Sequence, residues 1–160
     1  MTRAPAPATA FDPAFVATIS RIFEQKTSFN RALGLAVTSI APSRAACRLA
    51  MRPEFVGPPG SARLHGGVIS ASLDAIAGLA VMAEIAARHA DEPVPQRLAR
   101  FVHVGTIDLH VDFLRPATGV QFEARAEVVQ MGARVASIRM EFLASDGALL
   151  ATGTASYIVA

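Results

Sequence analysis

The sequence predicts one α+β domain in which a single antiparallel sheet wraps around one long apolar helix. Three observations lead to this fold class. Alternating apolar and polar residues mark six strands, two before and four after a central helical stretch. That stretch, residues 66–83, is apolar almost all the way round, so it needs cover on nearly every side. A chain of 160 residues is long enough for one domain with a substantial core and short for two.

The chain is expected to begin with a tail and an extra N-terminal helix. Residues 1–10 are rich in alanine and proline and are predicted to be disordered, so the single domain is expected to span residues 11–160. Asp12 followed by Pro13 is a helix-start signal, because the first can cap the helix and the second needs no N–H in its first turn. Apolar residues then recur at helical spacing to about Lys26.

Two strands and an irregular loop should follow. From Leu33 the apolar residues recur at every second position, which predicts a strand. A second strand over residues 45–51 directs Cys47 toward the core, where it serves packing. Residues 53–64 contain several prolines and glycines and are predicted to lack regular structure.

The central helix is predicted to end near His89. Residues 91–98 contain two prolines and are predicted to be a loop. Four strands should complete the sheet, over residues 106–113, 120–128, 136–142 and 151–159. Asp146 and Gly147 form a strong hairpin signal between the last two strands.

Composition narrows the class of protein. Charged residues make up 18% of the chain, against about a quarter in an average soluble domain, which predicts that another subunit covers part of the surface. The fourteen arginines are scattered and aromatic residues are few, which argues against a nucleic-acid partner. One cysteine, no signal-peptide pattern and no apolar run of membrane-span length favour a soluble, cytoplasmic protein without a membrane partner.

The central helix carries the candidate site. Asp74 is the one charged residue in its apolar run, and an ionised carboxylate in such surroundings is costly without partners. The helix opens on His65-Gly66-Gly67, where backbone N–H groups at the positive end of the helix dipole can approach a ligand closely. A structural reading stays open for both features, because Asp74 can bond the hydroxyl of Ser70 and a His-Gly-Gly sequence can form a tight turn.

Other chemistries find little support in the sequence. A nucleophile elbow, a phosphate-binding loop and a dinucleotide-binding fingerprint do not occur. Four widely spaced histidines and one inward cysteine do not form a zinc pattern, so we expect no metal site.

Three motifs resemble the hotdog-fold acyl-CoA thioesterases of the PaaI type. They are Leu64-His65-Gly66-Gly67 with Asp74 nine positions after the histidine, the strand Thr106–Pro116, and the closing hairpin from Asp146 to Ala155. The resemblance covers roughly residues 30–160. It implies a hotdog fold and a hydrolase that cleaves an acyl-CoA thioester at a dimer interface. It implies no cofactor, because coenzyme A belongs to the substrate.

The resemblance also implies roles for site residues. Asp74 would act as nucleophile or general base, and the N–H of Gly66 would polarise the thioester carbonyl. Thr106 would help to orient water or the acid, and His65 would shape the loop and hydrogen-bond near the thioester. Gly67 is a further candidate for substrate binding. Arg63, Arg97 and Arg100 are our candidates for binding the phosphates of CoA.

The chain departs from the family pattern at one place. Members commonly carry Asn or Gln six or seven residues before the histidine, where this chain has Pro59 and Pro58, which offer no side-chain donor. This departure favours one alternative, an acyl-CoA-binding module without turnover. A hotdog hydratase or dehydratase ranks last, because the histidine–acid spacing that such enzymes need is missing.

Helix geometry predicts a dimer independently of the resemblance. Gly66 and Asp74 are eight residues apart, which is about 12 Å along one helix, whereas both must lie within about 3 Å of one reacting group. Two antiparallel helices related by a twofold axis would bring Gly66 of one chain close to Asp74 of the other. We therefore expect a homodimer. A dimer of dimers is the assembly we favour, and the sequence leaves the choice between dimer and tetramer open.

Overall fold

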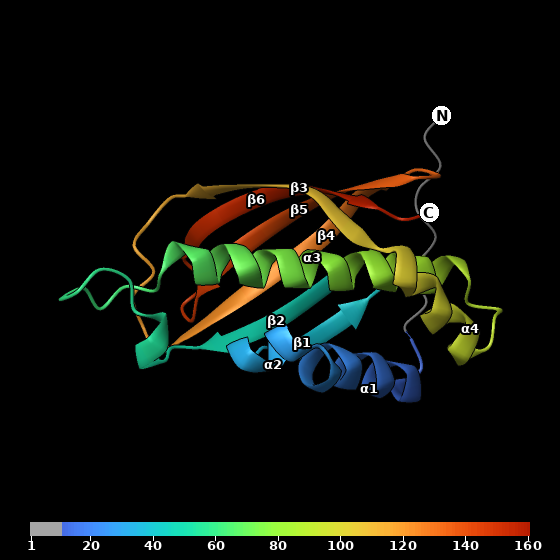
Figure 1. Cartoon of the computed structure of the whole chain (residues 1–160), viewed down its shortest axis with the longest axis horizontal. Coiled ribbons are helices and arrows are strands. Elements are labelled where there is room, and N and C mark those ends of the chain that lie inside the picture. Colours follow the sequence, from blue (N-terminus) through green and yellow to red (C-terminus); the bar gives the residue numbers. More distant parts are fainter. Residues whose placement is uncertain (1–10) are drawn as a thin grey trace.

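One sheet and one long helix make up most of the molecule. The structure, a computed structural model, describes residues 11–160, so the tail predicted over residues 1–10 lies outside the described residues. Six antiparallel strands pair in the order β1-β2-β4-β5-β6-β3, and α3 (Gly66–Arg88) crosses one face of the sheet and contacts every strand (Figure 1). The strands are β1 (Ala36–Ala41), β2 (Arg44–Ala50), β3 (Gly105–Phe113), β4 (Gln121–Met131), β5 (Val135–Ala144) and β6 (Leu149–Ile158). The predicted α+β hotdog arrangement is confirmed.

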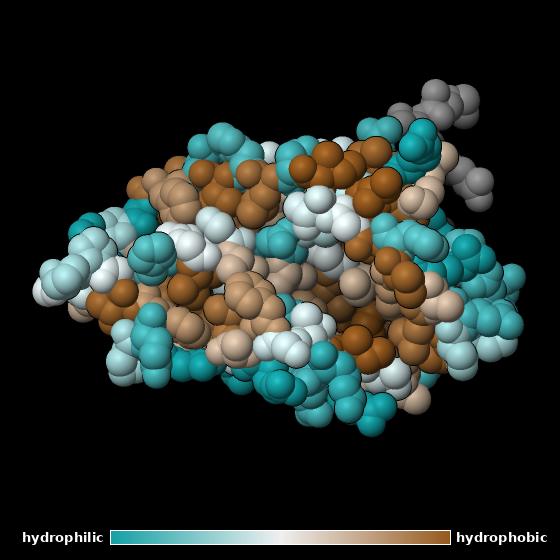
Figure 2. Space-filling model, in the orientation of Figure 1, coloured by the Kyte–Doolittle hydropathy of each residue, from teal (hydrophilic) through white to brown (hydrophobic). Residues whose placement is uncertain are grey.

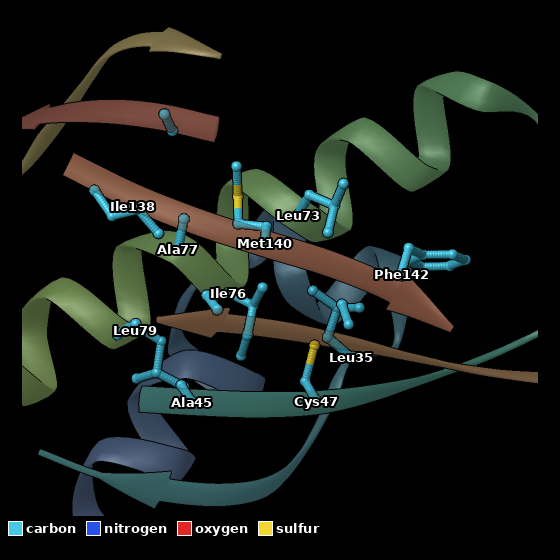
Figure 3. Packing of buried hydrophobic residues seen from close by; sticks show 14 of the residues in the cluster. Leu35, Ala45, Cys47, Leu73, Ile76, Ala77, Leu79, Ile138, Met140 and Phe142 are labelled. Atoms are coloured by element: carbon cyan, nitrogen blue, oxygen red, sulfur yellow. The ribbon is translucent and has the colours of Figure 1, made fainter. Parts of the chain in front are cut away.

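The core lies between α3 and the sheet. Fully buried side chains of α3, among them Leu73, Ile76 and Leu79, pack against strand residues such as Met140 and Phe142 (Figure 3). Among the described helices, α3 is long and apolar enough to cross a membrane by length and composition, yet most of its apolar stretch is buried in the fold. The apolar surface of the helix is therefore explained by its cover of strands.

Cys47 is part of this core. Its side chain is fully buried in β2 and lies in the cluster drawn in Figure 3. Burial, with a smaller contribution from Glu123, raises the pKa of the thiol to about 12. The prediction that Cys47 points inward is confirmed.

β3 forms one edge of the sheet. It pairs with β6 alone, and a bulge at Ile107 interrupts their register between Thr106 and Asp108. Ile107 and Phe113 of this strand are 55% and 54% exposed. The alternating apolar residues predicted for this strand are therefore only partly covered within one chain.

The N-terminal helix and the first strand are confirmed, but the predicted start of that strand at Leu33 is wrong. Asp12 Oδ1 accepts a hydrogen bond of 2.9 Å from the Phe15 N–H at the start of α1 (Pro13–Arg21). A π-helical turn, η1 (Ile22–Lys26), and a second helix, α2 (Ser28–Leu33), follow. Leu33 ends α2 because Gly34 adopts a left-handed conformation with φ of 69°, and β1 begins only at Ala36. Residues 13–33 are called the N-terminal helical segment below.

Short helical turns also occur where the sequence predicts loops. Residues 91–98 are not a loop throughout, because α4 (Val94–Ala99) begins there and continues into the 3₁₀ turn η3 (Arg100–His103). Pro95 is compatible with this helix because it stands in the first turn, where no N–H is needed. The stretch 53–64 contains a single 3₁₀ turn, η2 (Pro53–Phe55), and is otherwise irregular as predicted.

Candidate active site

The side chain of Asp74 is held by two hydroxyl groups. The Thr106 hydroxyl, at the start of β3, donates a hydrogen bond of 2.8 Å to Asp74 Oδ1. The Tyr157 hydroxyl in β6 lies 2.6 Å from the same oxygen and 2.6 Å from the main-chain oxygen of Asp74. Thr106 and Tyr157 are directly paired in the register of β3 and β6, so the sheet edge brings both hydroxyls to one point of α3. The structure thus brings together Asp74 and Thr106, as the sequence predicts.

The second carboxylate oxygen, Asp74 Oδ2, is left free. Within residues 11–160 it has no hydrogen-bond partner, and it is not sealed from solvent. The hydrogen bond between Ser70 and Asp74 that a structural reading offers is not seen, because the Ser70 hydroxyl donates instead to the Gly66 carbonyl at 3.1 Å. One oxygen is therefore fixed and the other is open to a reacting group.

Tyr157 belongs to this candidate site, although no motif in the sequence indicated it. It is the only tyrosine in the chain and is 3% exposed. Burial, and then the neighbouring Asp74 carboxylate, raise the pKa of its hydroxyl, so the group stays protonated and donates. The available signal was the alternation of the last strand, which turns a polar hydroxyl toward the core, where it must find a partner.

An apolar chamber of about 210 Å³ opens at this carboxylate, and we call it the Asp74 chamber. Asp74 is the one charged residue in its lining, beside the hydroxyls of Thr106 and Tyr157. Thr27 and Asn30 add further polar lining. Its apolar walls come from the N-terminal helical segment, α3, η3 and the start of β3, namely Ile19, Ile22, Phe23, Ala75, Gly78, Leu79, Met82, Phe101, Val104 and Gly105. Figure 2 shows large apolar areas on the surface of the molecule along which α3 runs.

The N-terminus of α3 offers a free backbone donor. His65 caps the helix, since its Nδ1 accepts a hydrogen bond of 2.9 Å from the Gly67 N–H. The Gly67 N–H is therefore already engaged, whereas the Gly66 N–H has no partner among the described residues. Phe113 lies over Gly66, and a Cβ added there would be 3.2 Å from the phenyl ring. This packing favours glycine at position 66.

A second cavity, of about 450 Å³, surrounds this helix end, and we call it the Gly66 groove. His65, Gly66 and Phe113 line it, together with Pro58. Two arginines, Arg63 and Arg115, also face it. Arg63 thus lies where an anionic group could bind beside Gly66, and Arg115 joins it as a residue that the sequence analysis did not select.

The other two selected arginines lie elsewhere. Arg97 is 7% exposed, and its guanidinium packs over the Phe15 ring at 4.5 Å from the ring centre. Arg100 forms an ion pair with Glu92, with 2.8 Å between its Nε and a carboxylate oxygen. Neither side chain lines the Gly66 groove or the Asp74 chamber.

Within one chain the Gly66 N–H and the Asp74 carboxylate do not meet. Gly66 and Asp74 stand eight residues apart on the same straight stretch of α3, a separation of about 12 Å. They belong to different cavities, the Gly66 groove and the Asp74 chamber. In the described part of the chain no three His, Cys, Asp or Glu side chains are grouped to hold a metal ion.

Comparison with known proteins places the chain in a family. A family model described as the thioesterase superfamily matches residues 62–151, which include α3 and β3 to β5. Curated relatives named medium/long-chain acyl-CoA thioesterase YigI occur in Salmonella typhimurium and Escherichia coli K12. They are 37% and 35% identical over 144 residues, which is 88% of this chain and 91% of each relative.

Solved structures share the fold. A Shewanella oneidensis protein described as related to the thioesterase superfamily is 31% identical, with a TM-score of 0.84 over 94% of this chain and all of that chain. The Escherichia coli PaaI protein of the phenylacetic acid degradation operon has the same fold at 15% identity, with a TM-score of 0.74 over 92% of this chain and 94% of that chain. The chain belongs to the thioesterase superfamily, with the hotdog fold predicted from its motifs.

Proposed function

We propose that this chain hydrolyses medium- to long-chain acyl-CoA thioesters to a free acid and coenzyme A. The observation that carries the proposal is a carboxylate at the polar end of an apolar chamber, with one oxygen fixed by Thr106 and Tyr157 and the other free. Relatives that are 35–37% identical over most of the chain are named for this activity. The proposed reaction needs no metal or redox cofactor, and we expect it in the cytoplasm.

In this reaction Asp74 Oδ2 takes a proton from a water molecule, and the resulting hydroxide adds to the thioester carbonyl carbon. The C–S bond then breaks, and the CoA thiolate leaves and takes up a proton. Direct attack by Oδ2 would give an anhydride that water hydrolyses. In either case negative charge develops on the carbonyl oxygen, where the Gly66 N–H would stabilise it.

The Gly66 donor would come from a second copy of the chain. Two α3 helices packed antiparallel about a twofold axis near Ser70 would place each Gly66 beside the partner's Asp74. Two features support such a dimer. β3 has an unpaired edge, and its exposed apolar side chains Ile107 and Phe113 need cover. Association of two such dimers into a tetramer remains part of the proposal.

The CoA phosphates would lie along the Gly66 groove. Arg63 and Arg115 line it and leave their guanidinium groups available to phosphate oxygens. We favour this pair over Arg97 and Arg100, which are engaged with Phe15 and Glu92.

The test of the activity is release of free thiol from a panel of acyl-CoA esters. Asp74→Ala and Asp74→Asn should both abolish turnover, because neither side chain can act as base or nucleophile. Asp91→Asn is the matched control, since it removes an exposed carboxylate that lies outside both cavities. Turnover that survives in both Asp74 variants would overturn the mechanism.

The same experiment decides the alternative, an acyl-CoA-binding module without turnover. Pro58 lines the Gly66 groove and offers no hydrogen-bond donor there, which favours the alternative. Tight binding of acyl-CoA by the wild-type chain, with no thiol release, would establish that alternative instead.

Complementation tests the shared site. Gly66→Pro removes the backbone N–H, and Asp74→Ala removes the acid, so each homodimer should be inactive. A mixed dimer has one site with both residues intact and one with neither. Mixing equal amounts under subunit exchange should therefore restore about a quarter of wild-type activity. No recovery, with subunit exchange verified, would contradict a site shared between chains.

A further inference from the structure

We propose that the acyl chain binds in the Asp74 chamber along the face of α3 that carries Asp74, Gly78 and Met82. The N-terminal helical segment forms the opposite wall. The chamber would then select substrates by chain length. This inference rests on the proposed function, because it assigns the Asp74 chamber to the acyl part of the substrate.

The chemistry of the chamber fits one acyl chain. Its one charged group, Asp74, meets the hydroxyls of Thr106 and Tyr157 at one point, which is where a thioester carbonyl would react. Away from this point the lining is mostly apolar, with Leu79, Met82 and Phe101 among its side chains. A fatty acyl chain has the matching polarity, with one polar end and a long apolar body.

The spacing on α3 gives the chamber a direction. Asp74, Gly78 and Met82 recur every four residues, so they lie along one face of the helix, and all three line the chamber. Gly78 stands about 6 Å and Met82 about 12 Å beyond Asp74 along the axis. This direction leads away from Gly66, so the acyl chain would extend away from the proposed twofold axis.

The opposite wall belongs to a part of the chain outside the matched thioesterase region. Ile19, Ile22 and Phe23 line the chamber from α1 and η1, whereas the family model matches residues 62–151. This wall is anchored to the fold at η1, because Glu24 accepts a hydrogen bond of 2.7 Å from the Val37 N–H of β1. The reacting residues and the selecting wall therefore come from different parts of the sequence.

Gly78 allows the chamber to be shortened. A Cβ added at this position would lie 3.6 Å from the Tyr157 ring, in ordinary van der Waals contact, with nothing closer. Leucine is also a better helix former than glycine. Gly78→Leu should therefore fold and fill the chamber about 6 Å from Asp74.

The experiment measures kcat/KM for a series of saturated acyl-CoA esters from butanoyl to hexadecanoyl. In the wild type kcat/KM should rise about fourfold with each methylene that the chamber buries, and then level off. Gly78→Leu should end the rise several methylenes earlier. Met82→Phe should lower kcat/KM for the longest esters alone, and Ile22→Ala should extend the rise to longer chains. Ala17→Leu adds the same side chain on the exposed face of α1 and should leave the series unchanged.

The outcomes separate this inference from the proposed function. If the variants change kcat/KM by one common factor for all esters, or leave kcat/KM unchanged for all of them, the chamber does not select substrates by chain length. The side chain added in Gly78→Leu would contact Tyr157, which could change kcat/KM for every ester. Met82→Phe and Ile22→Ala change other lining residues and so test chain-length selection without altering position 78. If no ester is hydrolysed, the proposed function fails. Dissociation constants of the same esters, measured by calorimetry on Asp74→Asn protein, then test the length selection directly.

Discussion

Replacing Tyr157 by phenylalanine should slow turnover without weakening substrate binding. The change deletes one hydroxyl, which lies 2.6 Å from Asp74 Oδ1, and keeps the ring that forms part of the chamber wall. Oδ1 then retains one donor, Thr106 at 2.8 Å. The carboxylate can rotate more freely, so Oδ2 is less often directed at the reacting group.

The size of the effect follows from the bond that is lost. A hydrogen bond to a charged group contributes about 1.5–3 kcal/mol, and about 1.4 kcal/mol corresponds to a tenfold change in rate. We therefore expect kcat to fall about 10- to 100-fold while KM changes less than about threefold. Thr106→Val should act in the same direction, and the double variant should show a coupling between the two hydroxyls, because both bind one oxygen.

Steady-state kinetics of thiol release gives kcat and KM for each variant, and thermal unfolding gives its melting temperature. A melting temperature close to that of the wild type assigns the loss in kcat to the site and not to the fold. A Tyr157→Phe protein with wild-type kcat, or with a raised KM at unchanged kcat, would refute the positioning role of the hydroxyl.

Further predictions concern α3 and the core. Gly66→Pro should lower kcat about 100- to 1000-fold, the effect of losing one oxyanion donor. It should still fold once Phe113 has made room for the ring, because proline suits the first helical position and His65 already has the extended ψ of 135° that a following proline requires. Gly66→Ala keeps the N–H and should cost far less kcat, once Phe113 has moved by a few tenths of an ångström. His65→Ala should lower the free energy of unfolding by about 1 kcal/mol in denaturant titrations, because the helix loses its N-cap. His65→Asn should restore most of this free energy, because an asparagine side chain can also cap the helix. Cys47 should resist alkylation by iodoacetamide at pH 8 in the folded protein, because burial keeps its thiol protonated, and should react once denaturant unfolds the chain.

The strand alternation and the all-round apolar helix were enough to predict the sheet and its central helix. The short helices were not predictable in the same way. At Leu33, an apolar residue at strand spacing also completes a helical turn, and only the left-handed Gly34 ends that turn. In α4, two prolines that indicate a loop instead stand at the start of a single helical stretch.

The candidate site divides along similar lines. Asp74 and Thr106 could be selected from local motifs, and the structure brings them into contact. Tyr157 reaches Asp74 because it pairs with Thr106 across β3 and β6, and no local sequence pattern reveals that pairing. Arg97 shows the opposite case, because an arginine in a polar, proline-rich stretch lies buried against Phe15.

α3 has a consequence for motion in the site. Because this helix contacts every strand, its middle turns cannot open without separating the whole sheet from its support. Amide protons around Asp74 should accordingly exchange with solvent only at the rate of global unfolding. The reacting carboxylate is thus kept rigid by the same contacts that hold the molecule together.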